Sequence, residues 1–296
     1  MSTWRLIIDG PADGAWNMAV DRAVLAAHES GDASPTLRLY RWDRPTVSLG
    51  RFQATGDVDA AYCEASGIGV CRRPTGGRGV LHDDELTYSV VAGVRDGLPR
   101  GVSASYRVLC GALVEAYRSL GVDAALTSRE RGARGAGACY LHATHADLSL
   151  GAAKLSGSAQ MWKGSSCLQH GSFVISRDVE REARVFRLDE EAAAALDEGT
   201  VTIEHVTGVR PAEIALVEAV RTGFARAFGA EFVPGSLTDA EETAARSFVG
   251  EHALTCGVTQ SARGERRVEV QSPVSPASDT MGAGTTRGLD SSGGAQ

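Results

Sequence analysis

Lysine is nearly absent from this chain of 296 residues. Lysine and arginine together number 30, yet only Lys154 and Lys163 are lysines, and both fall in one glycine- and serine-rich stretch. Arginine stays protonated at any relevant pH, whereas a lysine ammonium loses its proton when its surroundings favour the neutral amine. A lysine in a chain that otherwise uses arginine therefore indicates either chance or a role that needs a titratable amine.

Paired cysteines, long apolar runs and an export signal are also missing. Six cysteines are scattered without a paired spacing, which does not suit a disulfide framework and fits a reduced compartment. No run approaches the roughly 18 to 20 apolar residues that cross a bilayer. The start, MSTWRLIIDGPADG, has neither a basic nor an apolar signal region. We therefore expect a soluble protein with cytoplasmic localisation and no membrane partner.

The charge balance argues against a general nucleic-acid-binding protein. The formal net charge is −7, whereas general nucleic-acid binding usually needs a basic field. We therefore expect no nucleic-acid partner. An acidic protein partner would have to meet a local arginine patch, which the net charge does not decide.

Hydrophobic periodicity predicts alternating strands and helices, so the fold class that we expect is α+β, a largely antiparallel mixed sheet flanked by helices. An antiparallel meander is expected over 147–176, where short apolar runs alternate with glycines. The predicted strands cover 3–9, 36–42, 46–50, 68–73, 80–94 and 123–128. The predicted helices cover 14–31, 57–67 (capped by Asp57), 103–119, 178–186, 211–228 and 239–252.

The composition changes near residue 257. The C-terminal segment is rich in serine, glycine, threonine and proline and has little to bury. We expect one folded domain over 1–256 and a disordered tail over 257–296.

The first stretch that carries chemistry is RRPTGGRGVLHDDELTYS, residues 72–89. Two glycines after a strand let a ligand approach the backbone and permit positive φ at the turn. Arg72, Arg73 and Arg78 place fixed positive charge around that approach, which suits phosphate or carboxylate. His82, followed by an aspartate, suits an oriented histidine. A hairpin turn with solvated arginines explains the same pattern, so both interpretations stay open.

The second candidate is Cys139 with Lys154. A nearby ammonium stabilises a thiolate and lowers the pKa of the thiol, which gives an activated nucleophile able to take an acyl group as a thioester. Spacing alone does not bring the two side chains together. The alternative is a buried structural cysteine and an exposed lysine, and the scarcity of lysine favours the first interpretation.

The segment CYLHATH offers two further interpretations of the same cysteine. Cys139, His142 and His145 are spaced by three, which suits a zinc site, although no fourth ligand is evident. One of these histidines could instead serve Cys139 as a base. Beyond Lys154, the backbone N–H groups near Gly157 and Ser158 suit an oxyanion site, and a tight β-hairpin explains the same residues.

Taken together, these stretches resemble the lipoate/octanoate protein ligase and transferase superfamily, which shares its catalytic fold with biotin protein ligase. The matching pieces, in order, are WRLIIDGPADGAWNMAVDRAVL, RRPTGGRGVLHDDELTYS, KLSGSAQ and LQHGS, and the resemblance covers about residues 3–255. A cysteine upstream of the K-x-x-GSAQ lysine is similar to the cysteine-dependent octanoyl-[acyl-carrier-protein]:protein N-octanoyltransferases of the lipoate-ligase-like type. Gly79 departs from the alanine that is frequent in the family.

The resemblance implies an acyltransferase acting in protein lipoylation. Cys139 would take the octanoyl group from acyl carrier protein as a thioester, and the lysine of a lipoyl domain of 2-oxoacid dehydrogenase subunits, or of glycine-cleavage H protein, would receive it. No metal or cofactor is implied. An apolar tunnel is expected beside Gly76 and Gly77. The implied catalytic residues are Cys139 and Lys154, and the implied substrate-binding residues are Arg72, Arg73, Gly76, Gly77, His82, Gly157, Ser158, Gln160 and His170.

Two alternatives remain at this point. An ATP-dependent lipoate-protein ligase would share the lysine and not need the cysteine. A zinc-binding, non-catalytic module would use the cysteine and histidines of CYLHATH as metal ligands.

Overall fold

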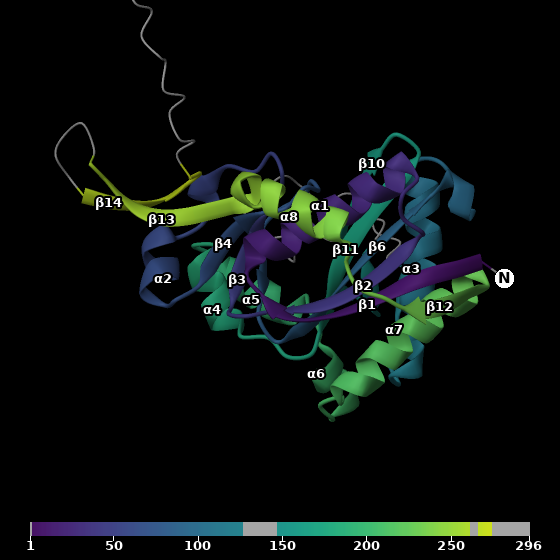
Figure 1. The fold of residues 1–296 in the computed structure, drawn as a ribbon. Helices are drawn as coiled ribbons and strands as arrows, with labels where there is room; N and C mark the ends of the chain where they lie inside the picture. The colour runs from purple at the N-terminus through teal and green to yellow at the C-terminus, as the bar shows by residue number, and fades with distance from the viewer. Residues whose placement is uncertain (1, 127–146, 261–265, 274–296) are drawn as a thin grey trace, which may run out of the picture.

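The computed structural model describes residues 2–126, 147–260 and 266–273. Its strands form a six-stranded sheet in the order β10-β11-β6-β2-β1-β12, a five-stranded sheet in the order β14-β13-β4-β3-β5, and a three-stranded sheet β7-β8-β9 (Figure 1). The strands are β1 (Ser2–Ala12), β2 (Thr36–Trp42), β3 (Thr46–Leu49), β4 (Gly69–Arg72), β5 (Val80–His82), β6 (Glu85–Gly93), β7 (Ala125–Leu126), β8 (Leu148–Leu150), β9 (Ala153–Ser156), β10 (Ser158–Lys163), β11 (Ser166–Val174), β12 (Ala230–Pro234), β13 (Ala253–Gln260) and β14 (Arg266–Gln271).

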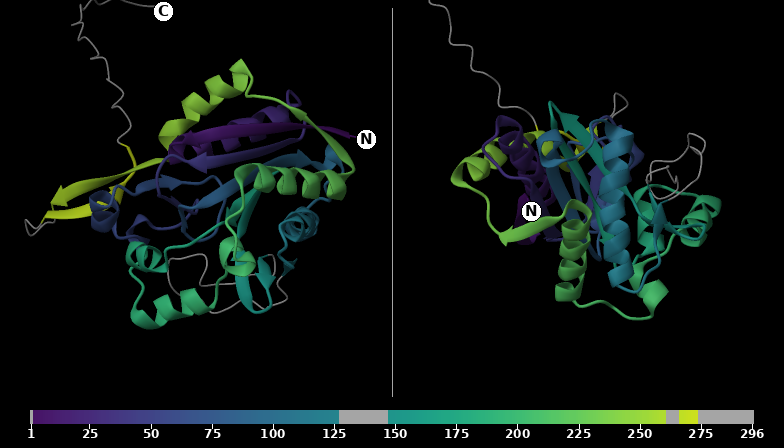
Figure 2. Two further views of the ribbon diagram at one scale, coloured as in Figure 1. Left: turned by 90° about the horizontal axis from the view of Figure 1, so that it is seen from below. Right: turned by 90° about the vertical axis from the view of Figure 1, so that its right-hand side faces the viewer.

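Helices cover both faces of the six-stranded sheet (Figures 1 and 2). Side chains of α3 and α7 pack with those of β1, β2 and β6 in the largest apolar cluster, whereas α1 and α8 pack on the opposite face. All nine residues of β6 are buried, as expected for a strand covered on both sides. The helices are α1 (Gly14–Ser30), α2 (Ala60–Ala65), α3 (Val102–Ser119), α4 (Val179–Val185), α5 (Glu190–Glu198), α6 (Ile203–Thr207), α7 (Glu213–Phe228) and α8 (Asp239–His252).

The expected fold class is confirmed. Strands β10, β11, β6 and β2 pair antiparallel, whereas β2, β1 and β12 pair parallel, so the sheet is mixed and largely antiparallel. Two details differ from the sequence prediction. The second helix is capped by Asp59, whose side chain accepts a hydrogen bond from the Tyr62 backbone, and not by Asp57. Strand β12 and helices α5 and α6 were not predicted from the pattern.

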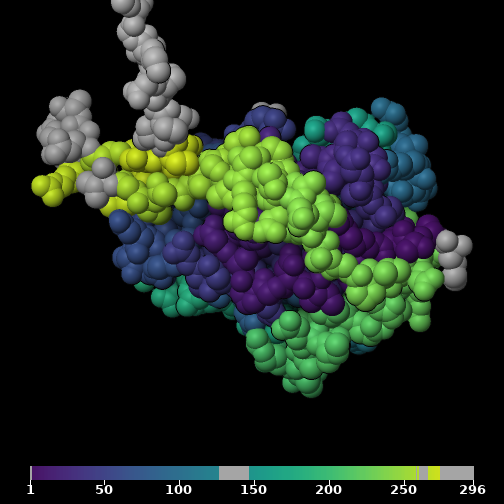
Figure 3. Space-filling model, in the orientation of Figure 1, coloured from purple at the N-terminus to yellow at the C-terminus, as the bar shows by residue number. Residues whose placement is uncertain are grey.

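The chain remains folded past residue 256. Strand β13 crosses that position, pairs with β4 of the five-stranded sheet and forms an antiparallel hairpin with β14. Figure 3 shows this hairpin projecting from the body of the molecule. The expectation of disorder is therefore wrong for 257–260 and 266–271. Residues 274–296 lie outside the described part of the chain.

The contact between α3 and α7 depends on one glycine. A Cβ atom at Gly223 would lie 2.3 Å from the backbone oxygen of Ala112, so the two helices pack backbone to backbone there. At Gly111, also inside a helix, an added Cβ would meet nothing within 4 Å. None of the helices in the described ranges combines the length and apolar character needed to span a membrane.

This pair of glycines gives a matched test of the packing. We expect Gly223→Ala to lower the free energy of unfolding by about 1–3 kcal/mol, because the helices must move apart. Gly111→Ala should raise it by roughly 0.5–1 kcal/mol, because alanine restricts the unfolded chain and fits the helix. Urea unfolding measures both values. Equal effects of the two substitutions would contradict the described packing.

Candidate active site

A cavity lies between the six-stranded and five-stranded sheets. Its walls come from α1, β2, β3, β5, β6, β10, β11 and the turns beside them. Apolar groups of Met18, Trp42 and Val80 form much of the lining. We call this space the central cavity.

Most of the residues predicted to bind substrate line the central cavity, although they come from four separate stretches of the chain. Three are clustered near the β9–β10 turn and on β11, and the others come from the RRPTGG turn and β5. The predicted residues in its wall are Arg73, Gly77, His82, Gly157, Ser158 and His170.

Three predicted residues do not belong to that wall. Arg72 points away, and its Nη1 donates hydrogen bonds to the backbone oxygens of Gly50 and Gln53, each at 2.8 Å. Gly76 is also absent from the wall, and a Cβ atom added there would meet nothing within 4 Å. Gln160 donates to Gln169 at 3.1 Å and accepts from neighbouring side chains, so it orients other polar groups.

The RRPTGG turn is held closed by its own arginine. Arg73 is buried and donates to the backbone oxygens of Gly76, Arg78 and Ser48 at 2.6–3.1 Å. Gly77 adopts a φ of +95°, which favours glycine. Much of what the Arg73 guanidinium can donate is therefore used to shape the turn. An arginine that only faces a ligand would not make these contacts.

Close approach of two backbones also fixes this turn. A Cβ at Gly50 would lie 1.9 Å from the backbone oxygen of Gly77, so only glycine fits at position 50. The end of β3 can therefore lie against the turn. The glycines of this turn thus serve packing as well as access to the cavity.

Lys154 does not line the central cavity but lies behind Gly157, which does. Its side chain is 3% exposed, and Nζ lies 3.0 Å from Oδ2 of Asp147, whose side chain is equally buried. A Cβ at Gly157 would come 3.5 Å from Nζ, so this glycine, which lines the cavity, leaves room beside the ammonium. The sequence prediction of a functional lysine included neither its burial nor its carboxylate partner.

The predicted nucleophile cannot be placed. Cys139, together with His142 and His145, lies outside the described residues, so its approach to Lys154 stays a prediction. The remaining cysteines show no thiolate character. Burial raises the pKa of Cys63 and of Cys167 to about 12, and it also raises the pKa of Cys71, Cys110 and Cys256. Among the described residues, no group of three potential metal ligands is found.

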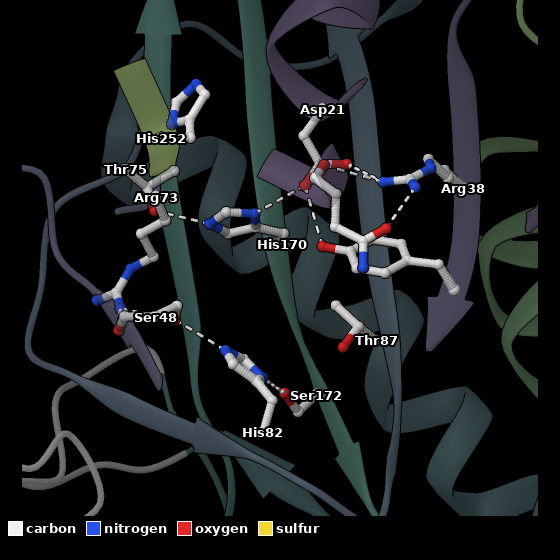
Figure 4. A network of polar contacts seen from close by, with 12 residues as sticks. Asp21, Arg38, Ser48, Arg73, Thr75, His82, Thr87, His170, Ser172 and His252 are labelled. Atoms are coloured by element: carbon white, nitrogen blue, oxygen red, sulfur yellow. Dashed lines mark hydrogen bonds and ion pairs between the residues drawn. The ribbon is translucent and has the colours of Figure 1, made fainter. Parts of the chain in front are cut away.

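One wall of the cavity holds a chain of hydrogen bonds from Asp21 through His170 to Thr75 (Figure 4). Nδ1 of His170 lies 3.0 Å from the Asp21 carboxylate, and Nε2 lies 2.7 Å from the Thr75 hydroxyl. Burial raises the pKa of Asp21, but the hydrogen bond from His170 and the charge of Arg38 outweigh burial and leave it lowered. Burial lowers the pKa of His170, so the imidazole is neutral at neutral pH.

A second chain of the same kind runs from Glu85 through His82 to Ser48, and Figure 4 shows its part from His82 to Ser48. Nδ1 of His82 lies 2.7 Å from Oε1 of Glu85, and Nε2 lies 2.8 Å from the Ser48 hydroxyl. Burial raises the pKa of Glu85, but His82 and the hydroxyls of Thr87 and Ser172 outweigh burial and leave it lowered. The carboxylate is therefore ionised at neutral pH.

Sequence reasoning found the two histidines but missed the groups that orient them. Asp21 had a detectable signal, because it is a carboxylate inside the mostly apolar helix segment NMAVDRAVL. Glu85 follows His82 by three positions, a spacing that is common in turns and so is weak evidence. Ser48 and Thr75 carry no signal, because small hydroxyl residues are frequent in strands and turns.

Comparisons with known proteins show the family of this chain. Residues 13–226 match the family model of the lipoyl protein ligase A/B catalytic domain. The chain is 40% identical to octanoyltransferase LipM of Kyrpidia tusciae, over 85% of this chain and 97% of that protein. It is 39% identical to octanoyltransferase LipM of Moorella thermoacetica, over 81% and 92%.

Solved structures show the same fold. A lipoate-protein ligase A bound with ATP is 25% identical, with a TM-score of 0.71, over 84% of this chain and 94% of that one. The bipartite lipoate protein ligase of Thermoplasma acidophilum matches the fold with a TM-score of 0.72 at 24% identity, over 84% and 92%. The chain therefore belongs to the lipoyl protein ligase A/B catalytic-domain family and, within it, to the LipM-type octanoyltransferases, which are acyltransferases.

Proposed function

We propose that this enzyme takes an octanoyl group from octanoyl-acyl carrier protein onto Cys139 and passes it to the lysine of a lipoyl domain or of glycine-cleavage H protein. The observation that carries the proposal is a mostly apolar cavity lined by Gly157, behind which a buried lysine lies, in a chain that is 40% identical to an octanoyltransferase. No ATP is required, because exchange between thioesters is nearly balanced and amide formation is downhill.

The central cavity suits the tail of an octanoyl group. Burying six methylenes at ~0.8 kcal/mol each contributes roughly 5 kcal/mol to binding. Met18, Trp42 and Val80 supply apolar wall, while Gly77 and Gly157 keep two sides open for close approach of the chain. The carbonyl would then lie at the end near Gly157, within reach of the Lys154 ammonium.

Lys154 would act there as a fixed positive charge. It would stabilise the thiolate of Cys139 before acylation and the oxyanion of each tetrahedral intermediate afterwards. Asp147 holds the ammonium in place at 3.0 Å. Because the ammonium is held in an ion pair, a fixed positive charge is a more suitable role for Lys154 than proton transfer.

The test separates this reaction from ATP-dependent ligation. Octanoyl-acyl carrier protein and apo H protein are mixed with the enzyme, with and without ATP, and the intact mass of the acceptor is followed. We expect one octanoyl group on the acceptor without ATP. Modification that needs both ATP and a free fatty or lipoic acid would overturn the proposal and favour a ligase, the reaction class of the ATP-bound structure that shares this fold.

A further inference from the structure

Transfer to a lysine requires a group that takes a proton from the acceptor. A lysine side chain has a pKa near 10.4 and is an ammonium at neutral pH, so it must lose a proton before it attacks a thioester. Lys154 does not suit this task, because its own ammonium is paired with the buried carboxylate of Asp147.

We propose that His82 accepts this proton through the hydroxyl of Ser48, and that Glu85 is the positioning residue that orients His82. The inference rests on the proposed function, because it concerns the second half of that reaction. It assigns a catalytic role to a histidine for which the family resemblance implied only substrate binding.

The carboxylate fixes the tautomer of His82. Oε1 of Glu85 accepts hydrogen bonds from His82 Nδ1 at 2.7 Å, from Thr87 at 2.6 Å and from Ser172 at 2.7 Å. An ionised carboxylate can only accept, so the proton of the neutral imidazole is on Nδ1. Nε2 therefore presents its lone pair to Ser48, at 2.8 Å.

Ser48 is suited to relay a proton. Its oxygen accepts a hydrogen bond from Nη1 of Arg73 at 3.2 Å, and its own proton is directed to Nε2 of His82. A hydroxyl oxygen has two lone pairs, so one remains for the incoming amine. Both Ser48 and His82 line the central cavity, whereas the Glu85 side chain lies behind them and is 2% exposed.

The position of His82 is tightly constrained. The indole ring of Trp42 stacks on the imidazole, with ring centroids 4.1 Å apart and an angle of 14° between the planes. Trp42 is itself held by a hydrogen bond from Nε1 to the Thr87 hydroxyl at 2.8 Å. The charged or titratable groups whose charges or contacts reach this region are Glu85, Glu182, Lys154, Arg73, His170, Tyr40 and Tyr117.

The proton balance of the step is complete. The acceptor ammonium gives one proton to the Ser48 oxygen as the Ser48 proton moves to Nε2 of His82. The neutral amine then attacks the thioester carbon, and a C–N bond forms. As the C–S bond breaks, its electron pair leaves on the sulfur of Cys139, which takes the second proton of the nitrogen. The products are the amide and the free thiol, and His82 returns its proton to solvent.

The chain offers a natural control. His28 on α1 also bridges a hydroxyl and a carboxylate, with Nδ1 2.7 Å from Ser166 and Nε2 2.8 Å from Asp96. It is as buried as the cavity histidines, but it does not line the central cavity. A hydroxyl–imidazole–carboxylate chain therefore has a structural role elsewhere in this protein. The catalytic role of His82 depends on its position in the wall of the central cavity.

The experiment measures the two half-reactions of the full-length enzyme separately. Octanoyl-enzyme is first formed from octanoyl-acyl carrier protein and quantified by intact mass, and its transfer to apo H protein is then followed in a single turnover. We expect His82→Asn to form octanoyl-enzyme and to transfer it at least about 100-fold more slowly, the usual range for loss of a general base. Glu85→Gln and Ser48→Ala should slow the same step.

Hydroxylamine distinguishes a catalytic role of His82 from a structural one. This small nucleophile is already unprotonated at neutral pH, so it should take the octanoyl group from His82→Asn and from wild type at similar rates. His28→Asn, the matched control, should transfer to H protein at the wild-type rate per folded molecule. The defect of His82→Asn should also shrink as the pH rises toward the pKa of the acceptor lysine.

Each other outcome is decisive. Transfer by His82→Asn to H protein at the wild-type rate would overturn the inference, and so would an equal loss toward hydroxylamine, which would indicate a structural role. If the octanoyl-enzyme does not form even in wild type, the proposed function itself fails. Should His82→Asn not fold, Ser48→Ala carries the same test, because it removes only one hydroxyl.

Discussion

Replacing Cys139 with alanine is expected to abolish octanoyl transfer. The proposed reaction passes through a thioester on this sulfur, so its loss removes both half-reactions, and the transfer rate should fall by at least about 10³-fold. Intact-mass measurement after mixing with octanoyl-acyl carrier protein should show a hydroxylamine-labile octanoyl adduct on wild type and none on Cys139→Ala.

The other cysteines supply the control for that experiment. Cys256 on β13 is half-buried, and burial raises the pKa of its thiol, so Cys256→Ser should keep both the adduct and the rate. A Cys139→Ala enzyme that transfers at the wild-type rate would show that no covalent intermediate forms on this residue. An adduct that persists in Cys139→Ala would place the nucleophile elsewhere.

Replacing Lys154 with methionine is expected to cost both stability and activity. The substitution leaves the Asp147 carboxylate buried without its ammonium, and breaking a buried ion pair in this way destabilises by about 3–5 kcal/mol. Urea unfolding should show this loss, and the transfer rate should fall because the positive charge beside the thioester is gone.

A double variant separates the two effects. In Lys154→Met with Asp147→Leu, no buried charge is left unpaired, so most of the stability should return while transfer stays lost. The only other lysine provides the comparison. Lys163 pairs with Glu29 at 2.6 Å but is 54% exposed, so Lys163→Met should change stability by less than about 1 kcal/mol and leave transfer intact. Equal effects of the two lysine substitutions would contradict the assigned roles.

The elements predicted correctly are those whose side chains show one clear period. Helix α1 places Met18, Ala19 and Ala23 on one face. Alternate residues of β2 and of β6 enter the largest apolar cluster, so tertiary packing reinforced the local pattern. Strand β14 reads RRVEVQ, and its alternating charges gave it the appearance of tail. It is a strand because β13 pairs with it and its buried Val270 packs in the apolar cluster that includes α2.

The site residues could be predicted where an uncommon residue type marks them in the sequence. They could not be predicted where their role depends on partners from distant parts of the chain. A rare lysine in a chain that otherwise uses arginine, and two histidines in glycine-rich surroundings, gave a signal in the sequence. The Lys154–Asp147 ion pair depends on a strand register, and the partners of His82 come from β3 and β6. Local patterns do not encode such distances, so the orienting groups could be identified only in the folded chain.

The hairpin β13–β14 bears on how the enzyme should be handled in practice. A recombinant version cut after residue 256 would lose β14 and the second half of β13, and it would take Val270 away from the cluster around α2. The unpaired edge of the remaining strand would favour aggregation. Recombinant versions of the enzyme should therefore retain the chain at least through residue 273, even for work that concerns only acyl transfer.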